Sequence, residues 1–126
     1  MRVLVDTVTF IWALRSPELI SRHAFSALES EATIRELSSI SITEIGMMHS
    51  AGKLNFDKGA VIDGVEDLKL RVLPYSEEHA FRLFDLECHH ADPFDRQIIV
   101  QALTENIPVI TPDEKFRVYA GLRIIW

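Results

Sequence analysis

Five acidic residues stand at the edges of apolar segments, where strands and helices are expected to begin or end. They are Asp6, Glu44, Asp92, Asp95 and Asp113. Carboxylates gathered at the mouths of buried strands repel one another and resist the loss of water. A fold that gathers them usually does so to bind a hard divalent cation such as Mg²⁺ or Mn²⁺, because these ions prefer oxygen ligands. The pattern therefore indicates a metal-dependent phosphodiesterase.

The segments that must position these acids alternate between two types. Short apolar runs predict strands at 2–5, 33–41, 71–75, 108–111 and 123–126. Helical spacing and capping residues predict helices at 7–14, 17–28, 42–51, 57–69, 93–105 and 114–120. A further helix is expected to open at Ser76, with Ala80, Leu83 and Phe84 on its apolar side. Alternating strands and helices predict an α/β fold whose parallel strands are joined by crossover helices on both faces of the sheet.

Length and composition restrict the possibilities further. The 126 residues are expected to form a single domain, 1–126, and the 48% hydrophobic and 25% charged content is typical of soluble globular proteins. A net charge of −6 argues mildly against a simple nucleic-acid binder, whose surface would be basic, although bound metal would offset part of this charge in a nuclease. The single cysteine, Cys88, excludes an internal disulfide and a cysteine-based zinc site. We see no signal peptide and no apolar stretch of membrane-spanning length, so the expected location is the cytoplasm.

The expected elements bring the five acids to one edge of the sheet. In an open parallel sheet, functional sites form beyond the carboxyl ends of the strands, near the point where the strand order reverses. Asp6 directly follows the first strand, and Asp113 lies two residues beyond a later one. Asp92 and Asp95 fall in the first turn of a helix, where the helix dipole favours carboxylates. Glu44 is expected to begin a helix after the second strand, on the same side.

Each acid also has an ordinary structural explanation. Asp6 and Asp92 are natural helix caps, and Asp95 stands where a capping-box partner of Asp92 would be. Glu44 alone would suit a solvated helix residue, and Asp113 alone would suit a turn. No single signal is specific, so the hypothesis depends on the placement that the five share.

Several stretches in order along the chain carry a family resemblance. They are 3–7 with Trp12, 39–45, 73–76, 90–96 continuing into Gln101-Ala102, 109–113 and 124–126. The most specific is His90-Ala91-Asp92-Pro93-Phe94-Asp95-Arg96. In these stretches the chain resembles the PIN-domain ribonucleases and, within them, the VapC-like toxins of bacterial toxin–antitoxin pairs. It departs at Val8, where many close relatives have histidine. The resemblance implies a PIN-like three-layer α/β/α domain with a central, mainly parallel twisted sheet.

The resemblance also implies roles for individual residues. The implied ligands of Mg²⁺ (or Mn²⁺) are Asp6, Glu44, Asp95 and Asp113. Asp92 is implied as a fifth catalytic acid, and which of Asp92 and Asp95 binds metal directly stays open. Thr111 would orient Asp113 or a metal-bound water, and Arg96 would partner a carboxylate or a phosphate. For His90, a structural hydrogen bond to its loop is expected rather than catalysis.

The leading hypothesis is hydrolysis of RNA phosphodiester bonds by one or two divalent ions. The resemblance further implies a cognate antitoxin protein as partner, and a homodimer. The alternative is a catalytically silent PIN-like module that acts through protein binding. Its candidate surface would include the aromatic residues Phe10, Trp12, Phe25 and Phe56. The complete acidic set favours the enzyme, because a decayed enzyme would be expected to have lost one of its acids.

Overall fold

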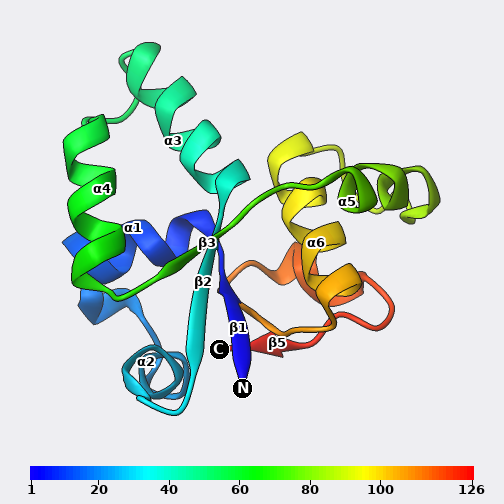
Figure 1. Cartoon of the computed structure of the whole chain (residues 1–126), viewed down its shortest axis with the longest axis horizontal. Coiled ribbons are helices and arrows are strands. Elements are labelled where there is room, and N and C mark those ends of the chain that lie inside the picture. The colour runs from blue at the N-terminus through cyan, green and yellow to red at the C-terminus, as the bar shows by residue number, and fades with distance from the viewer.

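Five parallel strands form the centre of the computed structural model, which describes residues 1–126 (Figure 1). They are β1 (Arg2–Val5), β2 (Ile34–Ser38), β3 (Arg71–Leu73), β4 (Val109–Ile110) and β5 (Ile124–Ile125). Their order across the sheet is β3-β2-β1-β4-β5, and every neighbouring pair is parallel. The strand order therefore reverses at β1, which pairs with β2 on one side and with β4 on the other.

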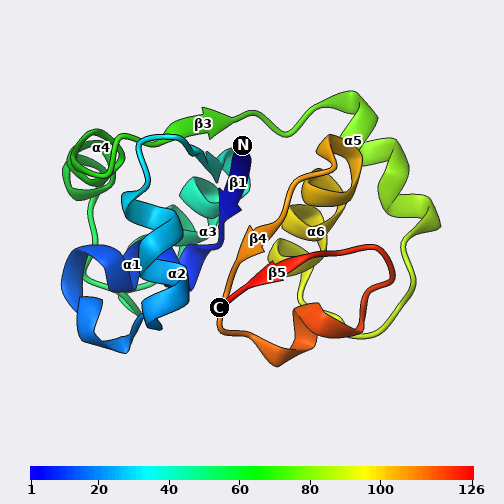
Figure 2. The ribbon, with the colours of Figure 1, turned by 90° about the horizontal axis from the view of Figure 1, so that it is seen from below.

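Helices cover both faces of this sheet. Four of them lie on one side, namely α1 (Thr7–Arg15), α2 (Arg22–Glu29), α3 (Ser39–Ser50) and α4 (Lys58–Asp67). The other side carries α5 (Glu77–Arg82) and α6 (Pro93–Glu105), and Figure 2 shows the sheet between the two groups. Three short 3₁₀ turns complete the chain: η1 (Pro17–Leu19), η2 (Leu83–Asp85) and η3 (Glu114–Val118). The predicted three-layer α/β/α architecture is confirmed. No helix combines the length and the apolar character that a membrane span requires.

The buried strand β1 contributes to two separate hydrophobic clusters. Val3 and Val5 pack with side chains of α1 to α4, whereas Leu4 packs with side chains of α6 and η3. This alternation follows from the geometry of a strand, whose successive side chains point to opposite faces. A strand that is apolar on both faces must be central, so the run Val3-Leu4-Val5 explains why β1 takes the middle of the sheet.

The prediction of one helix over 17–28 is wrong. Pro17–Leu19 forms only a 3₁₀ turn, and Ser16 makes no side-chain capping hydrogen bond. The helix begins after Ser21 instead, because the Ser21 hydroxyl accepts the Ala24 N–H at 3.1 Å. Between the two, Ile20 is extended and buried in the core, which the continuous helix would not allow.

The boundary between the second strand and the next helix also lies earlier than predicted. The strand ends at Ser38 rather than residue 41, and α3 begins at Ser39 rather than residue 42. The buried Ser38 hydroxyl causes the change, because it accepts the Ile40 N–H at 2.9 Å and donates to the side chain of Gln101. Glu44 therefore lies inside α3 and not at its start.

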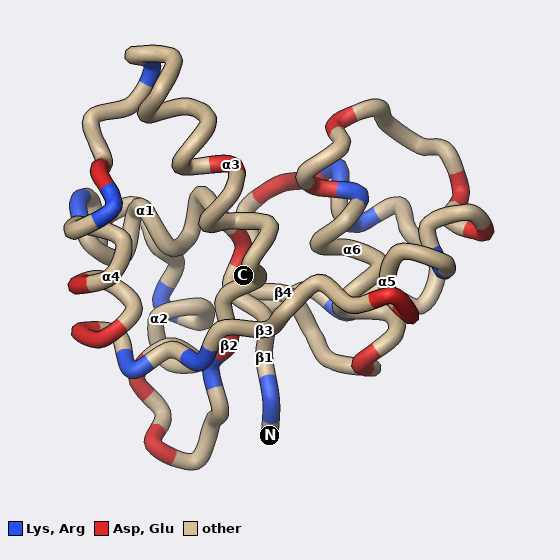
Figure 3. The backbone as a smooth tube through the Cα atoms, turned by 45° about the horizontal axis from the view of Figure 1, so that its top comes forward, with Lys and Arg blue, Asp and Glu red and all other residues tan.

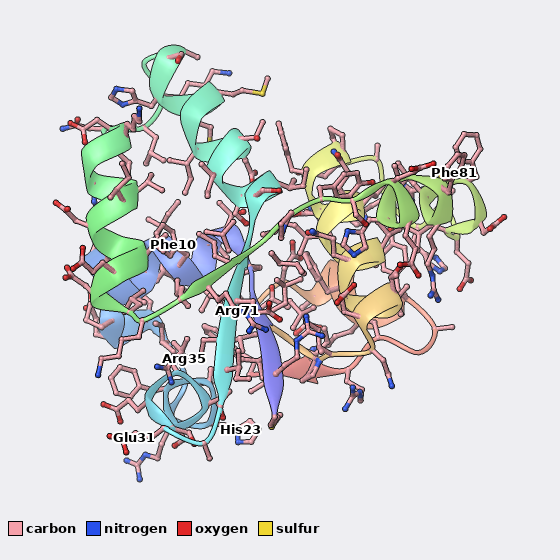
Figure 4. All side chains as sticks on the ribbon, in the orientation of Figure 1. Phe10, His23, Glu31, Arg35, Arg71 and Phe81 are labelled. Atoms are coloured by element: carbon pink, nitrogen blue, oxygen red, sulfur yellow. The ribbon has the colours of Figure 1, made fainter.

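The helix that opens at Ser76 has the predicted cap but not the predicted apolar side. Ser76 and His79 form a reciprocal capping box, and α5 ends at Arg82, with η2 after it. His79 is buried and bonds to Glu105 at 3.0 Å, whereas Ala80 is exposed and Phe84 is 86% exposed. Phe81 also projects into solvent (Figure 4). The predicted helix at 114–120 is the 3₁₀ turn η3, and the last strand is shorter than predicted.

Two glycines of α4 give a test of helix packing. A Cβ at Gly64 would lie 2.4 Å from Leu14 Cδ1 and 3.1 Å from the ring of the buried Phe10, whereas a Cβ at Gly59 would meet only Asp57 Oδ1 at 3.5 Å. We expect Gly64→Ala to lower the free energy of unfolding by about 1 kcal/mol, because overpacking outweighs the gain in helix propensity. Gly59→Ala is the matched control, and we expect it to stabilise the protein by roughly 0.5 kcal/mol. Urea unfolding of both variants measures the difference, and equal effects of the two substitutions would contradict this packing.

Candidate metal centre

A cleft of about 230 Å³ opens beside the end of β1. Its walls are formed by Asp6, Thr7, Val8, Ile11, Glu44, Met48, Asp95 and Asp113. Four of the five predicted acids thus line one cleft, and they come from four separate segments of the chain. Figure 3 shows acidic segments gathered between α3 and α6. A larger cavity of about 480 Å³ lies between α3 and α4, but Asp57 is the only acid in its lining.

Asp6 is fixed where the strand order reverses. Its backbone N–H donates to the Ile110 carbonyl of β4 at 3.2 Å, and its Oδ1 accepts the Thr9 N–H at 2.9 Å as the cap of α1. The residue is only 4% exposed. Burial raises the pKa of Asp6 to about 6, although hydrogen bonds from Thr111 and Thr9 oppose the shift and the charge of Asp113 adds to it. Asp6 is therefore both a helix cap and a carboxylate that is costly to ionise.

Asp95 and Asp92 have different positions at the start of α6. Asp92 is exposed, and its Oδ1 accepts the N–H groups of Phe94 and Asp95 at 2.9 and 3.0 Å. Asp95 is half-buried and lines the cleft. Burial raises the pKa of Asp95 to about 7, and the charges of Asp92, Asp113, Glu44 and Asp6 add to the shift. The two acids therefore differ in position: Asp92 caps α6, whereas Asp95 lines the cleft.

Glu44 reaches the cleft from the middle of α3. Burial raises the pKa of Glu44. The polar side chain of the neighbouring Thr7 lowers this pKa, whereas the negative charge of Asp92 raises it. The Thr7 hydroxyl donates its proton to Ser41 at 2.8 Å. Glu44 Oε1 is buried and has no hydrogen-bond partner in the protein. An unpaired buried carboxylate oxygen is rare in proteins, and this one is free to coordinate a cation.

Asp113 completes the cleft from the segment after β4. Its backbone N–H donates to Thr111 Oγ1 at 3.0 Å, and its Oδ1 accepts the Lys115 N–H at 2.9 Å. The buried Thr111 therefore orients the turn that carries Asp113, and it also lies against Asp6.

Of the two roles predicted for Arg96, the structure does not show the carboxylate pair, and contact with a phosphate stays a prediction. Arg96 forms no ion pair with a carboxylate; its Nη1 instead donates to the carbonyl of Glu87 at 2.8 Å and lies 3.4 Å from the Tyr119 hydroxyl. His90 Nδ1 bonds to the same hydroxyl at 2.7 Å. Tyr119 and Thr7 were missed by the sequence reasoning. Thr7 follows Asp6 in a stretch that carries the resemblance, whereas nothing in the sequence singles out Tyr119.

The donor set fits a hard cation, but the side chains do not surround one. Nowhere in the structure do three His, Cys, Asp or Glu side chains enclose a common point as metal ligands would. Three of the acids lining the cleft, Asp6, Glu44 and Asp95, nevertheless have raised pKa values, and Glu44 Oε1 has no hydrogen-bond partner in the protein. These are the features expected of carboxylates that lack their counter-ion. Asp6, Glu44, Asp95 and Asp113, which line the cleft, are the residues that would hold Mg²⁺ or Mn²⁺.

The division between Asp92 and Asp95 can be tested by substitution at Asp92. Asp92→Ala removes the cap of α6, and we expect the free energy of unfolding to fall by about 1 kcal/mol. Asp92→Asn keeps a capping oxygen and should cost much less. If Asp92 acts only as a cap, both variants should keep the RNA cleavage that the family resemblance implies within about tenfold of wild type. Urea unfolding and RNA cleavage measure the two effects, and a large loss of cleavage in Asp92→Asn would show that the Asp92 carboxylate takes part in the reaction.

Comparisons with known proteins identify the family and the fold. A family model described as the PIN domain matches residues 3–122. No curated protein matches the sequence. The fold is similar to that of VapBC2 from Rickettsia felis bound to a DNA fragment from their promoter, with 18% identity, 98% of this chain and 97% of that chain covered, and a TM-score of 0.75. DNA-bound VapBC from Salmonella typhimurium is also similar, with 20% identity, 98% of this chain and 96% of that chain covered, and a TM-score of 0.70. For VapBC-5 from Mycobacterium tuberculosis the identity is 18%, the match covers 98% of this chain and 97% of that chain, and the TM-score is 0.66.

Proposed function

This chain belongs to the PIN-domain family, and from that premise we propose that it is a cytoplasmic, metal-dependent endoribonuclease, the toxin of a toxin–antitoxin pair. The observation that carries the proposal is the shared cleft of Asp6, Glu44, Asp95 and Asp113. Side chains that repel one another this closely are stabilised by a divalent cation. The alternative of a silent binding module loses support, because Phe10 and Phe56 of its candidate surface are buried in the core.

The residues of the cleft would have different roles in hydrolysis. When bound, Mg²⁺ or Mn²⁺ supplies Lewis-acid activation of water and neutralises charge on the scissile phosphate. Asp6 gives the cleft a rigid side, because β1, β4 and α1 all fix its backbone and its Oδ1. Asp95, whose pKa is raised to about 7 in the metal-free protein, would be kept ionised near neutral pH by the bound cation and would act as one of its ligands. Apolar side chains of Val8, Ile11 and Met48 border the acids and reduce the access of bulk water.

The proposed partners follow from the family and from the charge. The similar structures named above are VapBC complexes, which supports an antitoxin as partner of this chain. A net charge of −6 favours a partner with a basic segment. We also propose that the toxin is a homodimer. Expression of this chain alone should arrest cell growth, and co-expression of the antitoxin from a neighbouring reading frame should relieve that arrest. Light scattering of the purified chain should give twice the monomer mass.

RNA cleavage by purified protein tests the function. We expect cleavage with Mg²⁺ or Mn²⁺ and none with EDTA. Asp95→Asn should remove cleavage, whereas Asp63→Asn on the exposed side of α4 should not. Equal cleavage by wild type and Asp95→Asn would indicate a contaminating nuclease and would refute the assignment.

A further inference from the structure

His90 approaches Asp95 but is not part of the cleft wall. Its Nε2 lies 3.4 Å from Asp95 Oδ2, and the imidazole is 12% exposed. We propose that His90 is a positioning residue: its Nε2–H holds Asp95 Oδ2 and leaves Asp95 Oδ1 free for a cation. This inference rests on the proposed function in one respect, namely that Asp95 is a metal ligand.

The direction of the hydrogen bonds around Tyr119 supports this assignment. An arginine side chain can only donate, so the Tyr119 oxygen accepts from Arg96 Nη1 at 3.4 Å. The Tyr119 hydroxyl then has its own proton to donate to His90 Nδ1, at 2.7 Å. A neutral imidazole that accepts at Nδ1 carries its proton at Nε2. The donors therefore run in one direction, from Arg96 through Tyr119 and His90 toward Asp95.

No other hydrogen-bond acceptor is paired with the Nε2–H group of His90. It is buried and makes no hydrogen bond of normal geometry with any protein group. Buried N–H groups are almost always paired. The 3.4 Å separation from Asp95 Oδ2 exceeds the usual N–H···O range of about 2.7–3.2 Å only slightly. A small rotation of the Asp95 carboxylate, such as cation binding would require, completes the bond.

The groups behind His90 are held firmly. Tyr119 is buried, and the rings of His89 and His90 pack edge-on against it with centroid distances of 4.9 and 5.6 Å. Arg96 is fixed by the Glu87 carbonyl at 2.8 Å. His90 is thus supported by residues from α6 and from the segment after η3. Such hydrogen-bonded support is what orients carboxylate ligands in metal sites.

The tautomer of His90 can be measured without any metal. A long-range ¹H–¹⁵N spectrum of the metal-free protein, recorded at a pH where imidazoles are neutral, distinguishes the two tautomers. We expect the Nε2–H form in wild type. In Tyr119→Phe, which keeps the buried ring but loses the hydroxyl, we expect a mixture of both forms. An Nδ1–H tautomer in wild type would overturn the proposal.

Mn²⁺ affinity then tests the positioning role. His90→Asn places an amide where Nδ1 stands and keeps a partner for Tyr119, but it no longer reaches Asp95. We expect calorimetry to show Mn²⁺ binding weakened about 10- to 100-fold. His90→Gln places its amide nitrogen near the position of Nε2 and should recover most of the affinity. His23→Asn is the control, because His23 is exposed on α2, away from the cleft, and its substitution should leave the affinity unchanged.

These results separate the inference from the proposed function. Equal Mn²⁺ affinity in His90→Asn and His23→Asn overturns the inference even if wild type cleaves RNA. Mn²⁺ binding that depends on His90 supports the inference even if no RNA is cleaved, and the proposed function then fails alone. If wild type binds no Mn²⁺, both fail. If His90→Asn does not fold, as judged by thermal unfolding in EDTA, Tyr119→Phe takes its place and should also bind Mn²⁺ more weakly.

Discussion

Replacing Asp6 by asparagine is expected to abolish RNA cleavage and at the same time to make the metal-free protein more stable. Loss of a ligand removes much of the metal's contribution, which is several kcal/mol, so we expect a fall of roughly 1,000-fold in the cleavage rate. Stability changes in the opposite direction because Asp6 is buried. A carboxyl group whose pKa rises from 3.8 to about 6 costs about 3 kcal/mol when it is ionised in the folded protein. Asparagine keeps the oxygen that caps Thr9 but carries no charge.

Asp57→Asn is the matched control for this experiment. Asp57 also caps a helix, with its Oδ1 accepting the Ala60 N–H at 2.9 Å, but it is exposed and does not line the acidic cleft. We expect neither cleavage nor the free energy of unfolding to change appreciably in this variant. Urea unfolding in EDTA at pH 7.5 and an RNA cleavage assay with Mn²⁺ measure both quantities. An Asp6→Asn protein less stable than wild type would show that Asp6 has a structural role beyond capping.

The stability of the metal-free protein is expected to fall as the pH rises from about 4 to about 7. Asp6 and Asp95 have pKa values of about 6 and about 7 in the folded protein, both raised from 3.8. In this range the folded state therefore binds more protons than the unfolded state, so raising the pH favours unfolding. We expect a decrease of a few kcal/mol, to which both acids contribute.

Divalent metal should reverse this pH dependence. Metal and protons compete for the same carboxylates, so stabilisation by Mg²⁺ grows over the pH range in which the metal-free protein loses stability. Urea unfolding across this range, with EDTA and with Mg²⁺, measures both trends. The double variant Asp6→Asn/Asp95→Asn should lose much less stability over this pH range and should show no response to Mg²⁺. A wild-type stability that rises between pH 5 and 7 in EDTA would contradict the assigned burial of these acids.

The fold could be predicted from the sequence because its central elements carry strong local signals. The apolar run of β1, the Asp92-Pro93 start of α6 and the Ser76 cap each identify one element by themselves. Errors arose where a tertiary contact decided the local structure. Ser38 ends its strand early because its hydroxyl bonds to Gln101, a partner 63 residues away. Phe84 was expected on the buried side of the helix that opens at Ser76. His79 is buried there instead, because Glu105 accepts the Nε2–H of His79.

The candidate site was predictable to a similar extent. The positions of Asp6 and Asp113 follow from the parallel sheet alone, because both stand at carboxyl ends of neighbouring strands. The choice between Asp92 and Asp95 could not be made from the sequence, since both lie on one helical turn and only burial separates them. The hydrogen bonds of Tyr119 with His90 and Arg96 could not be predicted from the sequence. They join segments that are distant in sequence, and no spacing pattern marks them.

The central place of β1 has a consequence for how the chain folds during its synthesis. Most of the larger hydrophobic cluster is available once residue 61 has been made, so much of one layer can assemble early. The cleft cannot, because Asp6 is held in place by β4, and contacts such as the one from Thr9 to Ile110 join residues 101 positions apart. A growing chain therefore carries Asp6 long before it carries Asp113. Domains of this kind complete their long-range strand pairing last. The proposed ribonuclease would in this way stay inactive until its chain is nearly complete.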